Sequence, residues 1–494
     1  MAAPNDSKRS SIDKAGVEVE ESVPVRDPLL EQYELIRDKT PEELKALNKA
    51  VVSKLDWRFL PMVCAMLIMN YLDRINVSNA RLAGMQHDLH MTDTMWSAGI
   101  SMFYVGYMIS QVPANVIIAK GKPRILLPSC MLCWSAVTIC MPAVTAGWGF
   151  MLCRFIVGLT EGPFVPAVSL MTSSWYTKHE SPLRMGIWHA GNTISQAISG
   201  LLAAGILQHM DYTAGLRAWQ WFLLLEGIVS ILVGVASFWF IPNFPDSTGT
   251  YFFTAEESQM AQYRQTVSAG GHAEDDTGDY WGGVWMALKD PFTYLFSAIH
   301  FFLIVAQSYK DFFPTILATL GFGETATYLI QAPPPIVAFL VTLAVSWSSG
   351  RMLEHGYHII APMLITLAAC AVMITTLNVG ARYFCMILLV SGPFIGLNLQ
   401  ISWETTVVPR PRTKRAALIA IANCLSTISH WFTPYFFLRN QEPYYQTGGG
   451  GIITGCGLSV IFVLITKWYC HKKNKALEER ERLAGEPKGW RFAT

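Results

Sequence analysis

The chain has 494 residues, of which 52% are hydrophobic and 15% are charged, whereas roughly 25% of residues are charged in an ordinary soluble domain. The formal net charge of +1 gives no field that would attract nucleic acid, so we expect no nucleic-acid partner. The apolar residues gather in long runs, which excludes the set of soluble domains that this length would otherwise suggest.

The first 54 residues are polar and mixed in charge, and they contain no apolar core of a signal peptide. We therefore predict that residues 1–54 are a disordered cytosolic tail and that the first apolar run is the targeting signal. Residues 471–494 are also polar, and we predict a second cytosolic tail there.

Twelve apolar runs lie between these tails, and each approaches the roughly 20 residues that a helix needs to cross a lipid bilayer. They are centred near residues 68, 107, 134, 160, 197, 231, 303, 336, 367, 393, 427 and 460. The sequence thus predicts an all-α polytopic membrane protein with twelve transmembrane helices in a lipid bilayer.

The first run, "RFLPMVCAMLIMNYLDRINVSNA", carries Asp73 and Arg74 side by side. A charge inside a membrane span is costly, and it usually lines a pathway or pairs with a partner. We expect both residues to handle substrate or protons. The alternative is a static ion pair, in which Asp73 neutralises Arg154 and pins two helices.

The fourth run, "MLCRFIVGLTEGPFVPAVSL", holds Arg154 and Glu161 seven residues apart, so the two side chains share one helix face about 10 Å apart along the axis. Gly158 and Gly162 give this helix a narrow side that permits close approach of a neighbour. Pro163 is expected to bend it.

The longest segment between apolar runs, residues 243–290, divides the chain into two halves of six runs each. Within it, "TAEESQMAQYRQ" predicts a short helix with Thr254 as N-cap and Glu257 completing a capping box. We expect six-helix bundles over residues 55–242 and 291–470, joined by this cytosolic central loop, with a site between the halves.

Positive charge predicts the orientation, because cytosolic loops of membrane proteins carry an excess of Lys and Arg. One set of loops holds Lys120, Lys122, Arg124, Lys178, Arg184, Arg351, Arg410, Arg412, Lys414 and Arg415, whereas the opposite set holds at most one basic residue per loop. We therefore place both termini in the cytosol and expect the protein in the plasma membrane.

The sequence does not indicate metal, redox or enzymatic chemistry. Cys130 and Cys133 form C-x-x-C inside the third run without a second pair, which favours packing over a metal or redox site. Glu226 lies among aromatic residues without a basic neighbour, and His430 lies in an apolar context, so both are interpreted as packing residues. No nucleotide-binding or hydrolase motif occurs, and we predict no enzyme, no catalytic or metal-binding residue and no cofactor.

The segments "RFIVGLTEG", "NYLDRINVSNARLAGMQHDL" and "WQWFLLLEGI" resemble the major facilitator superfamily and, within it, the anion:cation symporter family. The tract "WFIPNFPDSTGTYFFTAEESQMAQYR" resembles the fungal allantoate permease branch, which carries vitamins and nitrogenous carboxylates. The resemblance extends roughly from Leu55 to Lys473. The loop "IAKGKPRILL" departs from the superfamily pattern because it lacks the usual Asp.

The resemblance implies alternating access through two six-helix bundles, which function as a monomer. It also implies a core of coupling and anion-binding residues, which in this chain are Asp73, Arg74, Arg154 and Glu161. Tyr107 and Asn192 match polar positions on the substrate side of relatives.

These residues suggest a mechanism. Arg74, with Tyr107 and Asn192, binds the substrate carboxylate. Asp73 pairs with Arg154, which acts as the gating partner and holds one state shut. Glu161 and Asp73 take up protons from an acidic exterior and so release the pair.

We therefore predict a proton-coupled importer of a small organic carboxylate, such as nicotinate or a nitrogenous carboxylate. One alternative is an exporter of a fungal secondary metabolite with the same fold. Another is a transporter-like nutrient sensor that signals through its tails.

Overall fold

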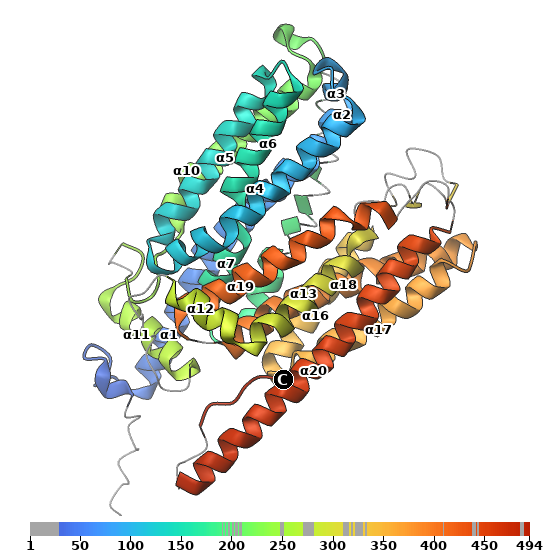
Figure 1. Cartoon of the computed structure of the whole chain (residues 1–494). Helices are drawn as coiled ribbons and strands as arrows, with labels where there is room; N and C mark the ends of the chain where they lie inside the picture. Colours follow the sequence, from blue (N-terminus) through green and yellow to red (C-terminus); the bar gives the residue numbers. More distant parts are fainter. Residues whose placement is uncertain are drawn as a thin grey trace, which may run out of the picture.

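The protein is described by a computed structural model. It describes residues 29–494 apart from 190, 193, 196–197, 200–201, 203–205, 207–209, 248–250, 270–280, 310–315, 318–319, 322–329, 331–332, 409, 437–440, 442–443 and 485–488. Over this part of the chain every regular element is a helix (Figure 1). The all-α class predicted from the apolar runs is confirmed.

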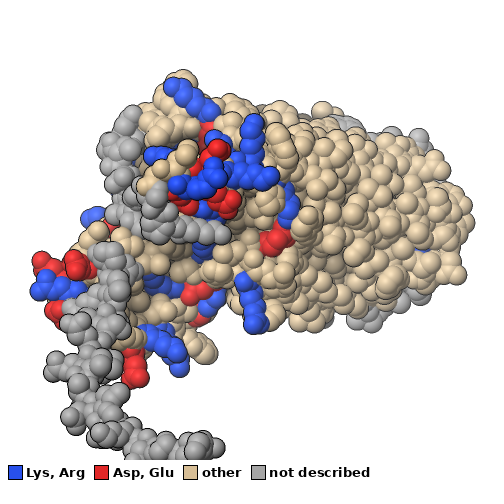
Figure 2. Space-filling model, turned by 90° about the horizontal axis from the view of Figure 1, so that it is seen from below, with Lys and Arg blue, Asp and Glu red and all other residues tan. Residues whose placement is uncertain are grey.

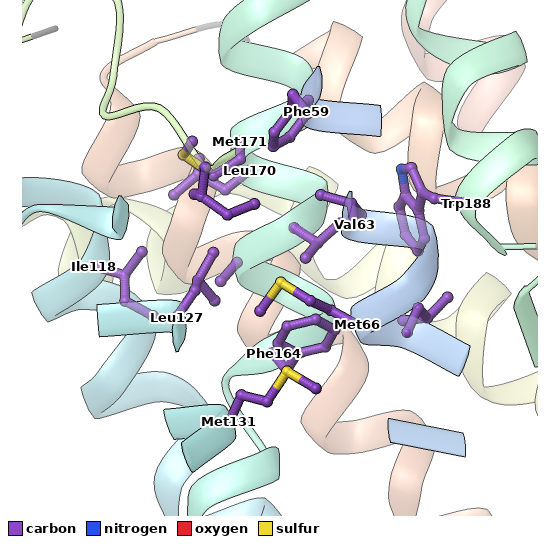
Figure 3. Packing of buried hydrophobic residues seen from close by; sticks show 14 of the residues in the cluster. Phe59, Val63, Met66, Ile118, Leu127, Met131, Phe164, Leu170, Met171 and Trp188 are labelled. Atoms are coloured by element: carbon purple, nitrogen blue, oxygen red, sulfur yellow. The ribbon is translucent and has the colours of Figure 1, made fainter. Parts of the chain in front are cut away.

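The first bundle contains α2 (Leu60–Leu82), α4 (Asp93–Lys120), α5 (Pro123–Cys140), α6 (Gly147–Glu161), α7 (Phe164–Trp175), α8 (Ser181–His189) and α10 (Ala218–Phe240). Helix α4 packs on α6, and α10 packs on both α5 and α2. Figure 3 shows apolar side chains meeting inside the bundle, with Met66, Phe164 and Met131 lying next to one another.

The second bundle contains α12 (Gly282–Lys289), α13 (Pro291–Ala306), α16 (Pro333–Met352), α17 (Gly356–Met373), α18 (Val379–Val407), α19 (Arg412–Thr427) and α20 (Gln446–Ala484). Helix α18 packs on α16 and α17, and α20 packs on α13 and α17. With 39 residues, α20 is about 58 Å long and extends beyond the roughly 30 Å of a hydrocarbon core.

Short elements complete the described chain. They are α1 (Pro41–Lys54), α3 (Met85–Asp88), α11 (Ala255–Ser268), the π-helical turn Leu55–Phe59, and the 3₁₀ turns Leu30–Gln32, Met141–Ala143, Thr213–Gly215, Ile428–Trp431 and Thr433–Phe436. The capping box predicted at Thr254 and Glu257 is confirmed at the start of α11.

Eight described segments are long and apolar enough to cross a membrane when α6 and α7 are counted as one, or nine if α12 and α13, which meet at a bend of 76°, also form one span. Helix α2 is not among them because Asn70, Asp73 and Arg74 lower its hydropathy, and α19 has only 16 residues. The run centred near residue 197 lies largely outside the described residues. Charged side chains gather toward one end of the molecule, and the rest of the face in Figure 2 is mostly uncharged.

The two bundles meet at the end where α1 and α11 lie, and they diverge toward the opposite end (Figure 1). We call the meeting point the α11 end; there α7 and α8 contact α16, α18 and α19. The Arg415 guanidinium donates to the Ser174 hydroxyl at 2.7 Å, and the Asn398 amide donates to the Pro182 carbonyl at 3.3 Å. Polar contacts between the halves therefore close this end.

The expected disorder of residues 1–54 is wrong for its second half, and residues 1–28 lie outside the described residues. Helix α1 begins with a capping box at Thr40 and packs on α11. Lys54 pairs with Glu257 at 2.6 Å. Composition alone suggested disorder because the partner that stabilises this helix lies some 200 residues away in the chain.

Candidate functional site

Glycines bring α4 and α6 close together and so position the charged residues of the first bundle. A Cβ built on Gly158 would lie 2.0 Å from the Phe103 carbonyl oxygen, and one on Gly106 would lie 2.3 Å from that of Phe155. A Cβ on Gly162 would meet the Tyr107 carbonyl oxygen at 2.4 Å. The narrow side predicted for the fourth span is confirmed.

The same span is interrupted after its buried acid. Helix α6 ends at Glu161, and α7 begins at Phe164. Pro163 has no N–H to continue the helical ladder, which accounts for the short interruption at the position where the sequence predicted a bend. Glu161 therefore lies at a joint, fully buried.

Arg74 is the charged residue that reaches across from α2 to α6. Its Nε donates to Glu161 Oε2 at 3.0 Å, and its Nη2 donates to Asn70 Oδ1 at 3.1 Å. The Arg74 side chain is 20% exposed, whereas the Glu161 side chain is inaccessible. The ion pair thus has one partner near the cavity and one behind it.

Aromatic rings surround the same guanidinium. Its carbon lies 4.8 Å from the ring centroid of Tyr107, 5.1 Å from that of Phe103 and 5.4 Å from that of Tyr71. Cation–π contacts of this kind favour the charged guanidinium while they exclude water. Arg74 is therefore held as a cation in a mostly apolar setting.

The pair expected between Asp73 and Arg154 is not formed in this structure. Asp73 Oδ1 instead accepts from the Thr138 hydroxyl of α5 at 3.1 Å, and the Arg154 guanidinium lies over the Phe103 ring at 4.5 Å. Consecutive residues on a helix point about 100° apart, so when Arg74 faces the cavity, Asp73 turns toward α5. Both Asp73 and Arg154 are buried.

A third acid joins this cluster. Glu226 on α10 is buried, and it interacts electrostatically with Asp73, Glu161 and Arg154. Both of its carboxylate oxygens lack a hydrogen-bond partner among the described residues. The sequence did not indicate its charged neighbours because they come from α2 and α6 rather than from its own helix, and its interpretation as a packing residue stays a prediction.

A small cavity of about 70 Å³ lies between the bundles, beside Arg74. The first bundle contributes Arg74, Tyr107 and Asn192 to its wall. These are the residues predicted to bind substrate, and the structure brings them together. Asp73, Arg154 and Glu161 lie behind this wall, not on it.

The second bundle lines the opposite wall with polar side chains that sequence reasoning missed. His300, Gln307 and Asn423 are among them. The Asn423 amide donates to the Tyr107 hydroxyl at 3.4 Å and so spans the two bundles. In the sequence, the only sign of these three residues is that they are polar residues within apolar runs.

Two stacked ring pairs lie at the cavity, and each contributes a histidine to its wall. His430, interpreted from the sequence as a packing residue, lines it and stacks on Tyr104 with ring centroids 5.2 Å apart. His189 stacks on Trp188 at 5.6 Å. The cavity thus offers flat faces from both bundles.

Comparison with known proteins identifies the family. The model for the Major Facilitator Superfamily matches residues 63–434. The MFS-type transporter efuF of Hormonema carpetanum is 29% identical over 429 residues, which are 85% of this chain and 84% of efuF. NicT of Pseudomonas putida, named as a metabolite transport protein, is 31% identical over 330 residues, which are 66% of this chain and 73% of NicT.

A solved structure shares the fold. The proton:xylose symporter XylE superposes with a TM-score of 0.68 at 11% identity, covering 85% of this chain and 96% of XylE. The twelve-helix architecture predicted from the apolar runs is confirmed by this family and fold. The chain belongs to the Major Facilitator Superfamily and is a membrane transporter of small molecules.

Proposed function

We propose that this transporter imports a small organic carboxylate together with protons, and that it belongs to the allantoate permease branch. One observation carries the proposal. Arg74 lies on the cavity wall, and its carboxylate partner Glu161 lies behind it. A carboxylate substrate entering the cavity competes with Glu161 for the same guanidinium.

Protonation of Glu161 decides that competition. A charged carboxyl group without a partner is costly in a buried site. Glu161 is therefore charged when it pairs with Arg74, and it is protonated and neutral when Arg74 binds the substrate instead. The binding of one substrate carboxylate to Arg74 is therefore accompanied by the uptake of one proton at Glu161. This exchange couples the two species without direct contact between them.

Asp73 is a second candidate proton carrier. Its Oδ2 has no hydrogen-bond partner among the described residues, and Glu226 and Glu161 increase the negative charge around it. Arg154 offsets part of that charge. In this proposal Arg154 acts as a gate by stabilising whichever of the acids is charged at each stage of the cycle.

The flat faces around the cavity favour an aromatic or planar carboxylate, such as nicotinate. The rings of Tyr104, Tyr107 and His430 line the cavity, with His430 stacked on Tyr104. Aromatic pairs prefer offset stacking or edge contacts, and a small planar acid can make both while its carboxylate reaches Arg74. Asn192 is placed to bind a further polar atom of the substrate.

The orientation supports import. The basic loops favour a cytosolic position for the α11 end, and the bundles meet at that end (Figure 1). We therefore propose that this conformation receives substrate from outside the cell and that both termini are cytosolic. The plasma membrane is the membrane that fits uptake of a nutrient.

The test is uptake of labelled carboxylates, nicotinate included, at outer pH 5 and pH 7.5, with and without an uncoupler. Acid-stimulated, uncoupler-sensitive accumulation of one compound is the expected result. If the protein is present at the cell surface and no compound accumulates, import is the wrong direction. Efflux of the same panel from preloaded cells then tests the exporter alternative.

A further inference from the structure

A second cavity lies at the α11 end, where the two bundles meet. It measures about 160 Å³, and one water occupies only about 30 Å³. Its wall includes residues from α7, α8, α11, α18 and α19. A ligand in this cavity would touch both bundles and the segment that joins them.

The described residues on the wall of this cavity carry more positive than negative charge. Arg412, Arg415 and Lys178 line it, and Asp246 is the one carboxylate among the described lining residues. Arg412 pairs with Asp246 at 3.0 Å, and the Asp246 side chain is 56% exposed to solvent. Among the described residues no carboxylate lies within ion-pair distance of Lys178. The balance of charge at the wall therefore favours an anion.

Hydrogen-bond donors converge on the same space. The Ser181 hydroxyl is buried, with the residue 1% exposed, and it has no partner in the described part of the chain. The Gln265 amide nitrogen is likewise buried without an acceptor there. The Ser174 hydroxyl accepts from Arg415, so its own hydrogen remains available to a ligand. These donors come from three different elements.

We propose that this cavity binds a phosphate group, either free or on a lipid headgroup. A tetrahedral oxyanion presents acceptors in several directions, which matches donors that arrive from α8, α11 and α19. Guanidinium groups pair with phosphate through charge-assisted hydrogen bonds. A monocarboxylate has only two oxygens in one plane, so it leaves part of this donor set without acceptors.

The protonation of Lys178 is consistent with this ligand. Burial lowers the pKa of Lys178. A bound anion stabilises the charged ammonium and so offsets that effect of burial.

Occupancy of the cavity has a conformational consequence. Ser181 and Lys178 belong to the first bundle, Arg415 belongs to the second, and Gln265 belongs to α11. A single anion would join all three parts. It therefore stabilises the conformation that is closed at the α11 end, and it slows the change to the opposite conformation.

The experiment uses the full chain in phosphatidylcholine nanodiscs and measures its thermal unfolding midpoint. Inorganic phosphate is added in one series, and sodium chloride is added in a second series at matched ionic strength. We expect a saturable rise in the midpoint with phosphate beyond that with chloride. Discs that contain phosphatidylinositol 4-phosphate, without added phosphate, form the second arm.

Lys178→Gln should shift the half-saturating phosphate concentration upward by about tenfold, because it removes one charge-assisted contact. Lys472→Gln, an exposed site on α20, is the matched control and should leave it unchanged. If Lys178→Gln unfolds, Gln265→Leu replaces it and should weaken the response in the same direction.

The two arms separate the sources of phosphate. A response to inorganic phosphate assigns a free anion, and a response only in the discs with phosphoinositide assigns a lipid headgroup. Equal effects of phosphate and chloride, together with no effect of the lipid, overturn the proposal. An equal phosphate response in wild type, Lys178→Gln and Gln265→Leu also overturns it.

Discussion

The two bundles have similar helical architecture but different chemistry. The first bundle buries Asp73, Arg154, Glu161 and Glu226, and it holds the partly exposed Arg74 beside them. The second bundle faces the central cavity with His300, Gln307, Asn423, Ser426, Thr427 and His430.

A buried acid of the second bundle shows the contrast. Glu404 lies near the end of α18 and accepts a hydrogen bond from the Gln400 amide at 2.6 Å. Its partner is therefore one turn away on the same helix. Glu161 instead pairs with a residue of another helix that also faces the cavity. The comparison teaches that the buried charges of the first bundle pair across helices beside the cavity, whereas the buried acid of the second bundle is satisfied within its own helix.

The largest effect expected is loss of uptake in Arg74→Ala. A hydrogen bond to a charged group contributes about 1.5–3 kcal/mol, so uptake should fall by roughly 10- to 150-fold. Initial rates of carboxylate uptake, normalised to protein in the membrane, measure it. Arg81→Ala, an exposed arginine later in α2, is the matched control. Undiminished uptake in Arg74→Ala would remove the proposed substrate anchor.

The next largest expected effect distinguishes the buried acid of the first bundle from that of the second. Glu161→Gln should abolish accumulation driven by a pH gradient, because an amide cannot carry the proton, while exchange of substrate across the membrane continues. Glu404→Gln should retain the response to the gradient. Accumulation ratios at outer pH 5 and pH 7.5 test both variants. A normal response in Glu161→Gln would place coupling elsewhere, with Asp73 as the next candidate.

A smaller effect concerns packing in the first bundle. Gly158→Ala should lower the thermal unfolding midpoint, because its Cβ meets backbone of α4 and overpacking typically costs about 1–3 kcal/mol. Gly457→Ala, on α20 with nothing within 4 Å of its Cβ, serves as the comparison and should be neutral or slightly stabilising. Equal midpoints for the two variants would contradict the close contact of α4 with α6.

The smallest effect expected is that of Tyr107→Phe. It removes the hydroxyl that accepts from Asn423 at 3.4 Å but keeps the ring beside Arg74. A neutral hydrogen bond contributes about 0.5–1.5 kcal/mol, so the KM for uptake should rise by about two- to tenfold with little change in maximal rate. A collapse of the maximal rate would instead assign Tyr107 to the conformational change.

Apolar runs predicted the helical fold well, since the length of a span and a proline at position 163 have direct physical consequences. Pairing across helices could not be predicted in the same way. The spacing of Arg154 and Glu161 shows that they share a face, but it cannot tell which base on α2 that face meets. Asp73 and Arg74 are neighbours in sequence, and only tertiary packing decides which one turns to the cavity.

Long-range partners explain the other differences. Glu226 gains charged neighbours from α2 and α6, and α1 gains stabilising contacts from α11. Neither partner lies in the local sequence from which the interpretation was made. Tyr107 and Asn192 did meet Arg74 at the cavity wall, and their roles in substrate binding remain predictions.

The interruption after Glu161 lets a small change of angle between α6 and α7 become a large movement at the far end of α7. Helix α7 has 12 residues and is therefore about 18 Å long, so each 10° of bending at the joint moves its far end by about 3 Å. That far end packs against α19 at the meeting point of the bundles, whereas α6 stays against α4. A displacement of this size is about as large as the donor–acceptor distance of a hydrogen bond. Small angular changes beside the buried Glu161 are thus enough to break contacts between the two halves.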